Sequence, residues 1–215
     1  MKHIKKNQPP EDFSEWKNQA NEDWQPNWDN FQKPEKTSVH NSLLKEQGFI
    51  CCYCGRRINQ IDSHIEHLRP RNKYPKLALY YDNFLASCQG ESETPPTIPV
   101  HCGHKKDKWY EQRFMVSPLV GNCAEFFRYT DDGQILATTD PVKQTAAAET
   151  IKRLALNINK LKRMREQAIE GILEIIETLN DDEIRKLING FEQTNTNGEY
   201  EEFCSAIAYV LKQYL

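Results

Sequence analysis

The chain has 215 residues, of which 38% are hydrophobic, and a formal net charge of −3. This length supports one buried core with an accessory helical part, and the negative charge argues against indiscriminate binding of polyanions. The sequence contains no run of about 18 apolar residues, which excludes the usual membrane-spanning helix. Its start, MKHIKKNQPPEDF, lacks the apolar stretch of a secretory signal. We therefore expect one compact cytoplasmic protein.

Residues 1–47 are predicted to form an N-terminal arm and a helix. Residues 1–34 are rich in Asn, Gln, Pro and Trp and show no apolar period, which indicates an arm or short helices laid over a core. Its tryptophans either attach the arm to the body or dock a partner: they are Trp16, Trp24 and Trp28. The stretch KTSVHNSLLKEQG then predicts a helix that is capped by Thr37 or Ser38 and ends at Gly48.

Residues 48–110 are predicted to form short strands and loops, and they carry the excess of positive charge. They hold nine Lys and Arg against six Asp and Glu, whereas residues 111–215 hold twelve against seventeen. The stretch ESETPPTIPV, residues 91–100, is interrupted by consecutive prolines and predicts a loop.

A hairpin and a helical region are predicted in the second half of the chain. In residues 111–140, FFRYTDDGQILATT places Asp-Asp-Gly between two alternating apolar runs. Residues 141–215 show apolar stripes at helical spacing. Within them, residues 152–165 hold six Lys and Arg and no acid, which is typical of a solvated helix face and is also compatible with contact to a phosphate backbone.

Seven cysteines in a chain expected in a reducing compartment favour metal binding over disulfides. Cys51 and Cys54 form a C-x-x-C turn, and Cys88 and Cys102 can supply two further thiolates for a tetrahedral structural zinc. Pairing Cys52 with Cys54 is the alternative register, but one intervening residue spans a metal poorly. The two remaining cysteines are expected to be ordinary buried thiols: Cys123 and Cys204.

The cysteine pairs bracket SHIEHLRPRNKYPKLALYYDNFLASC and HCGHKKDKW, a pattern that resembles the HNH endonuclease family. The resemblance is greatest to the retron-associated HNH proteins, which include the PtuB nuclease subunits of Septu antiphage systems. It implies an α+β fold: a ββα-metal (HNH) core with a Cys₄ zinc site, flanked by an N-terminal arm and C-terminal helices. Matched by position, Glu66 and His67 are the acidic-His pair, Asn83 is the central Asn, and His104 is the last motif residue.

The chemistry of phosphodiester hydrolysis explains these residue types. Histidine has the pKa of a general base near neutral pH, which suits His67. Glu66 and His104 suit a catalytic Mg²⁺ or Mn²⁺, and Asn83 suits a neutral orienting hydrogen bond. The expected phosphate contacts are basic neighbours of these residues: Arg69, Arg71, Lys105 and Lys106.

The other histidines receive weaker assignments. His3 and His40 have no evident partner in the sequence, and we expect them to be polar surface residues. His64 lies three residues before His67, so on a strand the two side chains face opposite ways. Its role, and that of His101 beside a cysteine, stay open.

The resulting hypothesis is a metal-dependent HNH endonuclease acting on nucleic acid, DNA favoured, as the effector of an antiphage defence system. The resemblance implies an ATPase partner of the PtuA type and leaves room for a retron reverse transcriptase with its DNA–RNA product. The chain has no phosphate loop of its own, in agreement with dependence on an ATPase. The alternatives are a ribonuclease of the same fold that cuts tRNA, and a non-catalytic zinc-knuckle module that binds nucleic acid.

Overall fold

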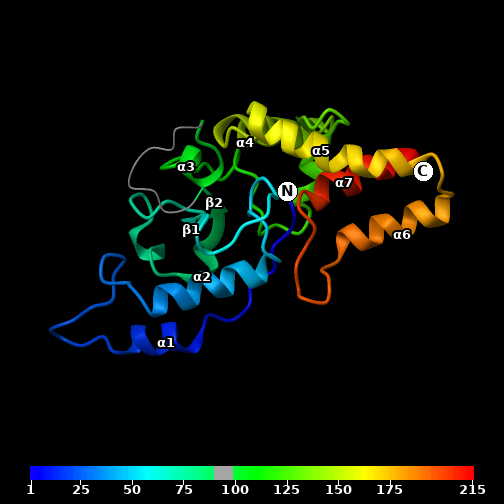
Figure 1. Cartoon of the computed structure of the whole chain (residues 1–215). Coiled ribbons are helices and arrows are strands. Elements are labelled where there is room, and N and C mark those ends of the chain that lie inside the picture. Colours follow the sequence, from blue (N-terminus) through cyan, green and yellow to red (C-terminus); the bar gives the residue numbers. More distant parts are fainter. Residues whose placement is uncertain (90–98) are drawn as a thin grey trace.

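The computed structural model describes residues 1–89 and 99–215. It is an α+β structure in which two small antiparallel sheets are surrounded by helices (Figure 1). Most of the predicted proline-rich loop lies outside the described residues. The helices are α1 Glu11–Asn18, α2 Glu35–Glu46, α3 Cys102–Lys106, α4 Pro141–Arg153, α5 Asn159–Ile176, α6 Asp181–Glu192 and α7 Cys204–Leu211. The strands are β1 Ser63–His67, β2 Phe84–Cys88, β3 Phe127–Tyr129 and β4 Ile135–Ala137.

The N-terminal arm packs on the body of the protein. Phe13 and Trp16 of α1 meet Phe31, with ring centroids 5.0 and 5.3 Å from it, and all three side chains are buried. Of the two predicted roles for the tryptophans, the structure therefore supports attachment of the arm. The predicted cap of α2 is wrong: the helix begins at Glu35 directly after Pro34, because proline suits the start of a helix and needs no hydrogen-bonding partner there.

Strands β1 and β2 form the centre of the predicted 48–110 segment. They pair antiparallel with Glu66 opposite Leu85 and His67 opposite Phe84, and every residue of both strands is buried. The short helix α3 follows and contacts β2. A two-stranded sheet with both faces buried needs cover on each side, which α2 and the arm provide on one side and α3 on the other (Figure 1).

The predicted hairpin and helical region are both present. β3 and β4 pair antiparallel around a turn at Gly133, whose φ of +75° and close approach to the Lys162 carbonyl require glycine. Helix α6 begins with a capping box in which Asn180 and Glu183 bond each other's backbone N–H groups. Within residues 1–89 and 99–215, no helix is both long and apolar enough to cross a bilayer.

The basic run at 152–165 is not a continuous charged face. Arg165 is 1% exposed and donates hydrogen bonds to the carbonyls of Gly133 and Leu156, so it fixes the hairpin turn to α5. Lys162 pairs with Asp132 at 2.7 Å. Arg165 therefore contradicts both interpretations of this run, the solvated face and the phosphate-binding strip.

Two hydrophobic clusters contain most of the buried hydrophobic side chains of the described residues. One spans the chain from Met1 to Leu156 and contains the arm, β1, β2 and the cysteines. The other lies between α5, α6 and α7. The loop before α7 joins them, because Phe203 donates its backbone N–H to Gly55 in the cysteine turn.

Candidate active site and metal centre

Four cysteines converge at one point beside the β1–β2 sheet. The ligand atoms of Cys51, Cys54, Cys88 and Cys102 all lie within 4.8 Å of one another, which suits a tetrahedral metal site. Cys52 is buried but stands outside this group. The four thiols that lie together are thus those of the predicted C-x-x-C register, without Cys52. Among the described residues, no other group of three or more His, Cys, Asp or Glu side chains is close enough to hold a metal ion.

Within the cluster the surroundings favour the deprotonated form of one sulfur, that of Cys51, whereas the pKa of Cys102 is raised, mainly by burial, and that of Cys88 is raised as well. Burial favours the neutral thiol of Cys51, but hydrogen bonds from the surrounding thiols, Cys102 first, outweigh it and lower the pKa of Cys51 well below its usual value. The His101 ring is fully buried, and its Nδ1 lies 3.2 Å from the Cys102 sulfur and 3.5 Å from the Cys88 sulfur. His101 is thus part of the surroundings of the cysteine cluster.

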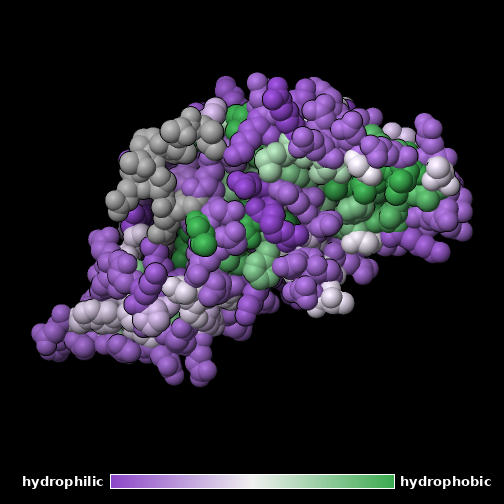
Figure 2. Space-filling view, viewed as in Figure 1, coloured by the Kyte–Doolittle hydropathy of each residue, from purple (hydrophilic) through white to green (hydrophobic). Residues whose placement is uncertain are grey.

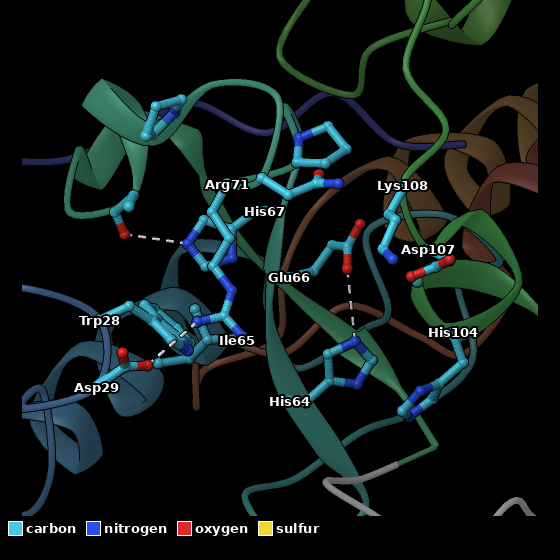
Figure 3. A pocket seen from close by; sticks show the side chains of 15 residues that line it. Trp28, Asp29, His64, Ile65, Glu66, His67, Arg71, His104, Asp107 and Lys108 are labelled. Atoms are coloured by element: carbon cyan, nitrogen blue, oxygen red, sulfur yellow. Dashed lines mark hydrogen bonds and ion pairs between the residues drawn. The ribbon is translucent and has the colours of Figure 1, made fainter.

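A pocket of about 670 Å³ opens beside β1 and the start of α3. His64, Glu66 and His67 line it from the strand, and His104 lines it from the helix (Figure 3). Successive residues of a strand point to opposite sides, so Glu66 and His67 leave β1 in different directions, whereas His64 and Glu66 share one face. All of these side chains nevertheless reach the pocket. It brings together the predicted catalytic residues Glu66, His67 and His104, and it adds His64.

Of the two ring nitrogens of His67, one is hydrogen-bonded to the backbone and the other has no hydrogen-bonding partner among the described residues. Its Nε2 lies 3.0 Å from the carbonyl oxygen of Ala78, and a carbonyl only accepts, so Nε2 carries the proton in the neutral ring. Trp28 and Phe84 pack edge-on against the ring at 4.4 and 5.1 Å. Burial lowers the pKa of His67, which keeps the ring neutral with a lone pair on Nδ1.

The two carboxylate oxygens of Glu66 have different surroundings. Oε1 accepts from Lys106 Nζ at 2.8 Å and from the Tyr53 hydroxyl at 3.2 Å, whereas Oε2 faces His64 Nε2 at 3.5 Å. Burial would raise the pKa of Glu66, but the contacts with His64 and Lys106 outweigh it, and the pKa is lowered. The carboxylate is therefore charged, with one oxygen fixed by donors and the other directed at His64.

Lys106 does not occupy the surface position expected of a phosphate contact. Its side chain is 1% exposed, and its ammonium donates to the Glu66 carboxylate and to the carbonyl of His67. The short helix α3 directs this side chain inward, toward β1, because the buried carboxylate needs a counter-charge.

We predict that Lys106→Met destabilises the protein by about 3 kcal/mol, since methionine keeps the volume but leaves the Glu66 charge buried without its partner. Urea denaturation measures this. Lys105→Met is the matched control, because the neighbouring Lys105 is exposed; equal stability of the two variants would contradict the importance of the ion pair.

Asn83 is buried away from the pocket and fixes the loop that follows β1. Its Oδ1 accepts from the Arg69 N–H at 2.8 Å, and its Nδ2 donates to the carbonyls of Arg69 and Leu77. Ala78, which bonds His67, directly follows Leu77 in this loop. Asn83 thus acts on the site through the backbone and touches none of the pocket.

The remaining predicted site residues lie at or near the pocket mouth. The Arg71 guanidinium is half exposed and stacks on Trp28 at 5.1 Å, while Arg69 stacks on Tyr110 at 5.6 Å. Lys105 is exposed and borders an adjoining groove of about 510 Å³. The groove shares Asp107 and Lys108 with the pocket and is otherwise lined by Lys105, Lys106, Trp109, Lys152 and Arg153.

The chain is similar to a curated retron protein. No family model matches the chain. A curated protein of Vibrio cholerae serotype O1 biovar El Tor, named "Retron Vc95 putative HNH endonuclease", is 28% identical over 146 residues, which cover 66% of this chain and 68% of that protein. The resemblance to retron-associated HNH endonucleases is confirmed. The similarity supports a nuclease function.

Sequence reasoning missed several features of this HNH-like site. Trp28 and Asp29 of the arm line the pocket, yet nothing in the arm's composition distinguishes them from its other residues. His40, predicted to be a surface residue, is buried and bonds the Ser63 hydroxyl at 2.9 Å. The position of His64 could have been predicted, because residues two apart on a strand share a face and His64 lies two residues before Glu66.

Proposed function

We propose that the protein is a metal-dependent HNH endonuclease that hydrolyses phosphodiester bonds in nucleic acid, with DNA as the favoured substrate. The observation that carries this proposal is the pocket in which His67, with an uncommitted Nδ1, lies next to the charged Glu66. In this reading β1, β2 and α3 are the ββα-metal core, and the four cysteines bind a structural zinc that fixes the start of α3.

In the proposed mechanism, His67 is the general base. Its Nε2–H is held by the Ala78 carbonyl, so Nδ1 is the nitrogen that takes a proton from the attacking water. Trp28 and Phe84 keep the ring in one orientation. Asn83 positions the loop that carries Ala78. Glu66 and His104 are proposed to hold a Mg²⁺ or Mn²⁺, which neutralises charge on the phosphate and the departing oxygen.

The basic groove beside the pocket suits a phosphate backbone. Lys105, Lys108 and Lys152 line it, and Arg153 stacks on Trp109 at 5.7 Å, which pairs a cation with an aromatic surface for a base. Arg69 and Arg71 extend the positive charge to the mouth of the pocket. Water attack on phosphorus needs no 2′-hydroxyl, so the same site fits an RNA such as tRNA.

The deciding experiment incubates the purified, zinc-loaded protein with plasmid DNA and with tRNA in Mg²⁺ or Mn²⁺, alone and with the ATPase encoded beside it. Nicking or linearisation of the plasmid supports the proposal. Cleavage of tRNA alone supports the ribonuclease alternative. Binding of either nucleic acid without cleavage, in every metal and with the ATPase present, supports the non-catalytic zinc-knuckle module.

The proposed partner is an ATPase of the PtuA type, within an antiphage system that also includes a retron reverse transcriptase and its DNA–RNA product. The negative net charge makes strong autonomous binding to nucleic acid unfavourable, so a partner must supply further positive surface. Deleting the arm cannot test whether it binds the ATPase, because the arm packs in the core and Trp28 lines the pocket. The C-terminal helices are the proposed docking surface, where hydrophobic side chains gather over α5 and α7 (Figure 2).

We predict that Ile175→Glu weakens co-purification with the co-expressed ATPase at least ~10-fold, since a charge placed in an interface core costs several kcal/mol. Ile175 lies on α5 and is 45% exposed. Val142→Glu on α4, where Val142 is 88% exposed, is the control and should retain binding. An affinity pull-down with zinc content measured in parallel checks this; unchanged capture by Ile175→Glu would place the interface elsewhere.

A further inference from the structure

His64 is a buried histidine with one ring nitrogen unpartnered in the described part of the chain and the other directed at Glu66. It is 9% exposed, and its Nδ1 is buried without a hydrogen-bonding partner among the described residues. The nitrogen that faces Glu66 is Nε2, and a carboxylate oxygen only accepts, so this contact needs a proton or a cation between the two atoms. The His64 ring packs beside the His104 ring, with centroids 4.4 Å apart, and presents Nε2 to Glu66 (Figure 3).

The spacing of the two facing donors suits a shared cation. Glu66 Oε2 and His64 Nε2 are 3.5 Å apart. An ion bonded to two donors at about 2.1 Å each separates them by about 3.0 to 3.4 Å in octahedral or tetrahedral geometry. Glu66 Oε1 is already bonded by Lys106 and Tyr53, so Oε2 is the oxygen left for a cation.

The backbone of α3 leaves room at this point because residue 103 is glycine. A Cβ built on Gly103 would lie 2.7 Å from Glu66 Oε2, 2.7 Å from His64 Nε2 and 2.9 Å from the Ser87 hydroxyl. Any larger residue would therefore fill the space next to both donors. The Gly103 N–H donates to that hydroxyl at 3.0 Å, which holds the helix in place.

We infer that His64 Nε2 and Glu66 Oε2 together bind the divalent cation, in a space that Gly103 keeps open, and that this donor pair prefers Mn²⁺ to Mg²⁺. The inference rests on the proposed nuclease function only in giving the ion a catalytic role; binding of the ion does not depend on that function. Imidazole is a better ligand for first-row transition metals than for Mg²⁺, and pairing with Lys106 leaves the carboxylate less charge to attract a hard cation. His104 of the proposed function, water and a substrate phosphate complete the coordination.

The test measures Mn²⁺ binding to the zinc-loaded full chain by loss of the electron paramagnetic resonance signal of free Mn²⁺. His64→Ala should bind Mn²⁺ at least ~10-fold more weakly, and its preference for Mn²⁺ over Mg²⁺, measured by competition, should shrink. Gly103→Ala should also bind at least ~10-fold more weakly, although it removes no donor. His3→Ala, at an exposed position, should bind as the wild type does.

One zinc per chain and an unchanged circular dichroism spectrum in each variant show that the fold is intact. Wild-type affinity in either His64→Ala or Gly103→Ala overturns the inference, as does a wild-type protein that binds no Mn²⁺. A protein that binds Mn²⁺ through His64 yet cuts no nucleic acid supports the cation site and counts against the proposed function, so the two failures are distinguishable.

Discussion

His67→Ala should lower nucleic-acid cleavage at least ~10²-fold while one zinc per chain is retained, because removing a general base costs about that factor. The expectation rests on the tautomer that the structure assigns. The Ala78 carbonyl holds the proton on Nε2, and the pKa of the ring is lowered by burial, so Nδ1 of a neutral imidazole is ready to accept a proton. Cleavage rates measured at saturating Mn²⁺ check the prediction.

The comparison needs a control that separates chemistry from packing, since His67 also contacts Trp28 and Phe84. His67→Gln preserves much of the packing and provides no base, so it should be as inactive as the alanine variant. Trp28→Phe preserves the base and removes part of the packing, and it should retain most of the activity. Wild-type cleavage by His67→Ala, or recovery in His67→Gln, would remove His67 from the role of base.

The sequence was most informative where short-range geometry decides the outcome. The C-x-x-C spacing indicated which cysteine joins Cys54, and strand alternation placed the His64 and His67 side chains on opposite faces. It was least informative about charges whose partners are distant in the chain. Lys106 reads as one of several surface lysines, and only the fold shows that it neutralises Glu66 forty residues earlier.

The arm illustrates the same limit. No periodicity in residues 1–34 predicts that Trp28 lies against His67, because that contact depends on how the whole arm crosses the β1–β2 sheet. Arg165 is a further case: a basic residue in a basic run reads as solvated, yet its hydrogen bonds to Gly133 and Leu156 make it part of the core. Tertiary contacts decided these positions: ring packing for Trp28 and hydrogen bonds for Arg165.

Loss of the cysteine cluster should have a larger effect on the structure than any other change considered. Cys54→Ser combined with Cys88→Ser should abolish zinc binding and unfold the segment around β1, β2 and α3. A structural zinc contributes about 10 to 16 kcal/mol of apparent binding free energy in small zinc domains, which is as large as the whole stability of a typical domain. Elemental analysis and circular dichroism measure the two effects.

Metal binding at the cysteine cluster is coupled to the pocket, because Cys102 is the first residue of α3. Gly103 and Lys106 follow it in the same helix, so a chain without zinc loses at once the room beside Glu66 and the counter-charge of its carboxylate. Cys52→Ala is the matched control: Cys52 is equally buried and adjacent in sequence but lies outside the cluster, so this variant should keep one zinc and its Mn²⁺ affinity. Full zinc content in the Cys54/Cys88 double variant, or its loss in Cys52→Ala, would show that another set of ligands binds the metal.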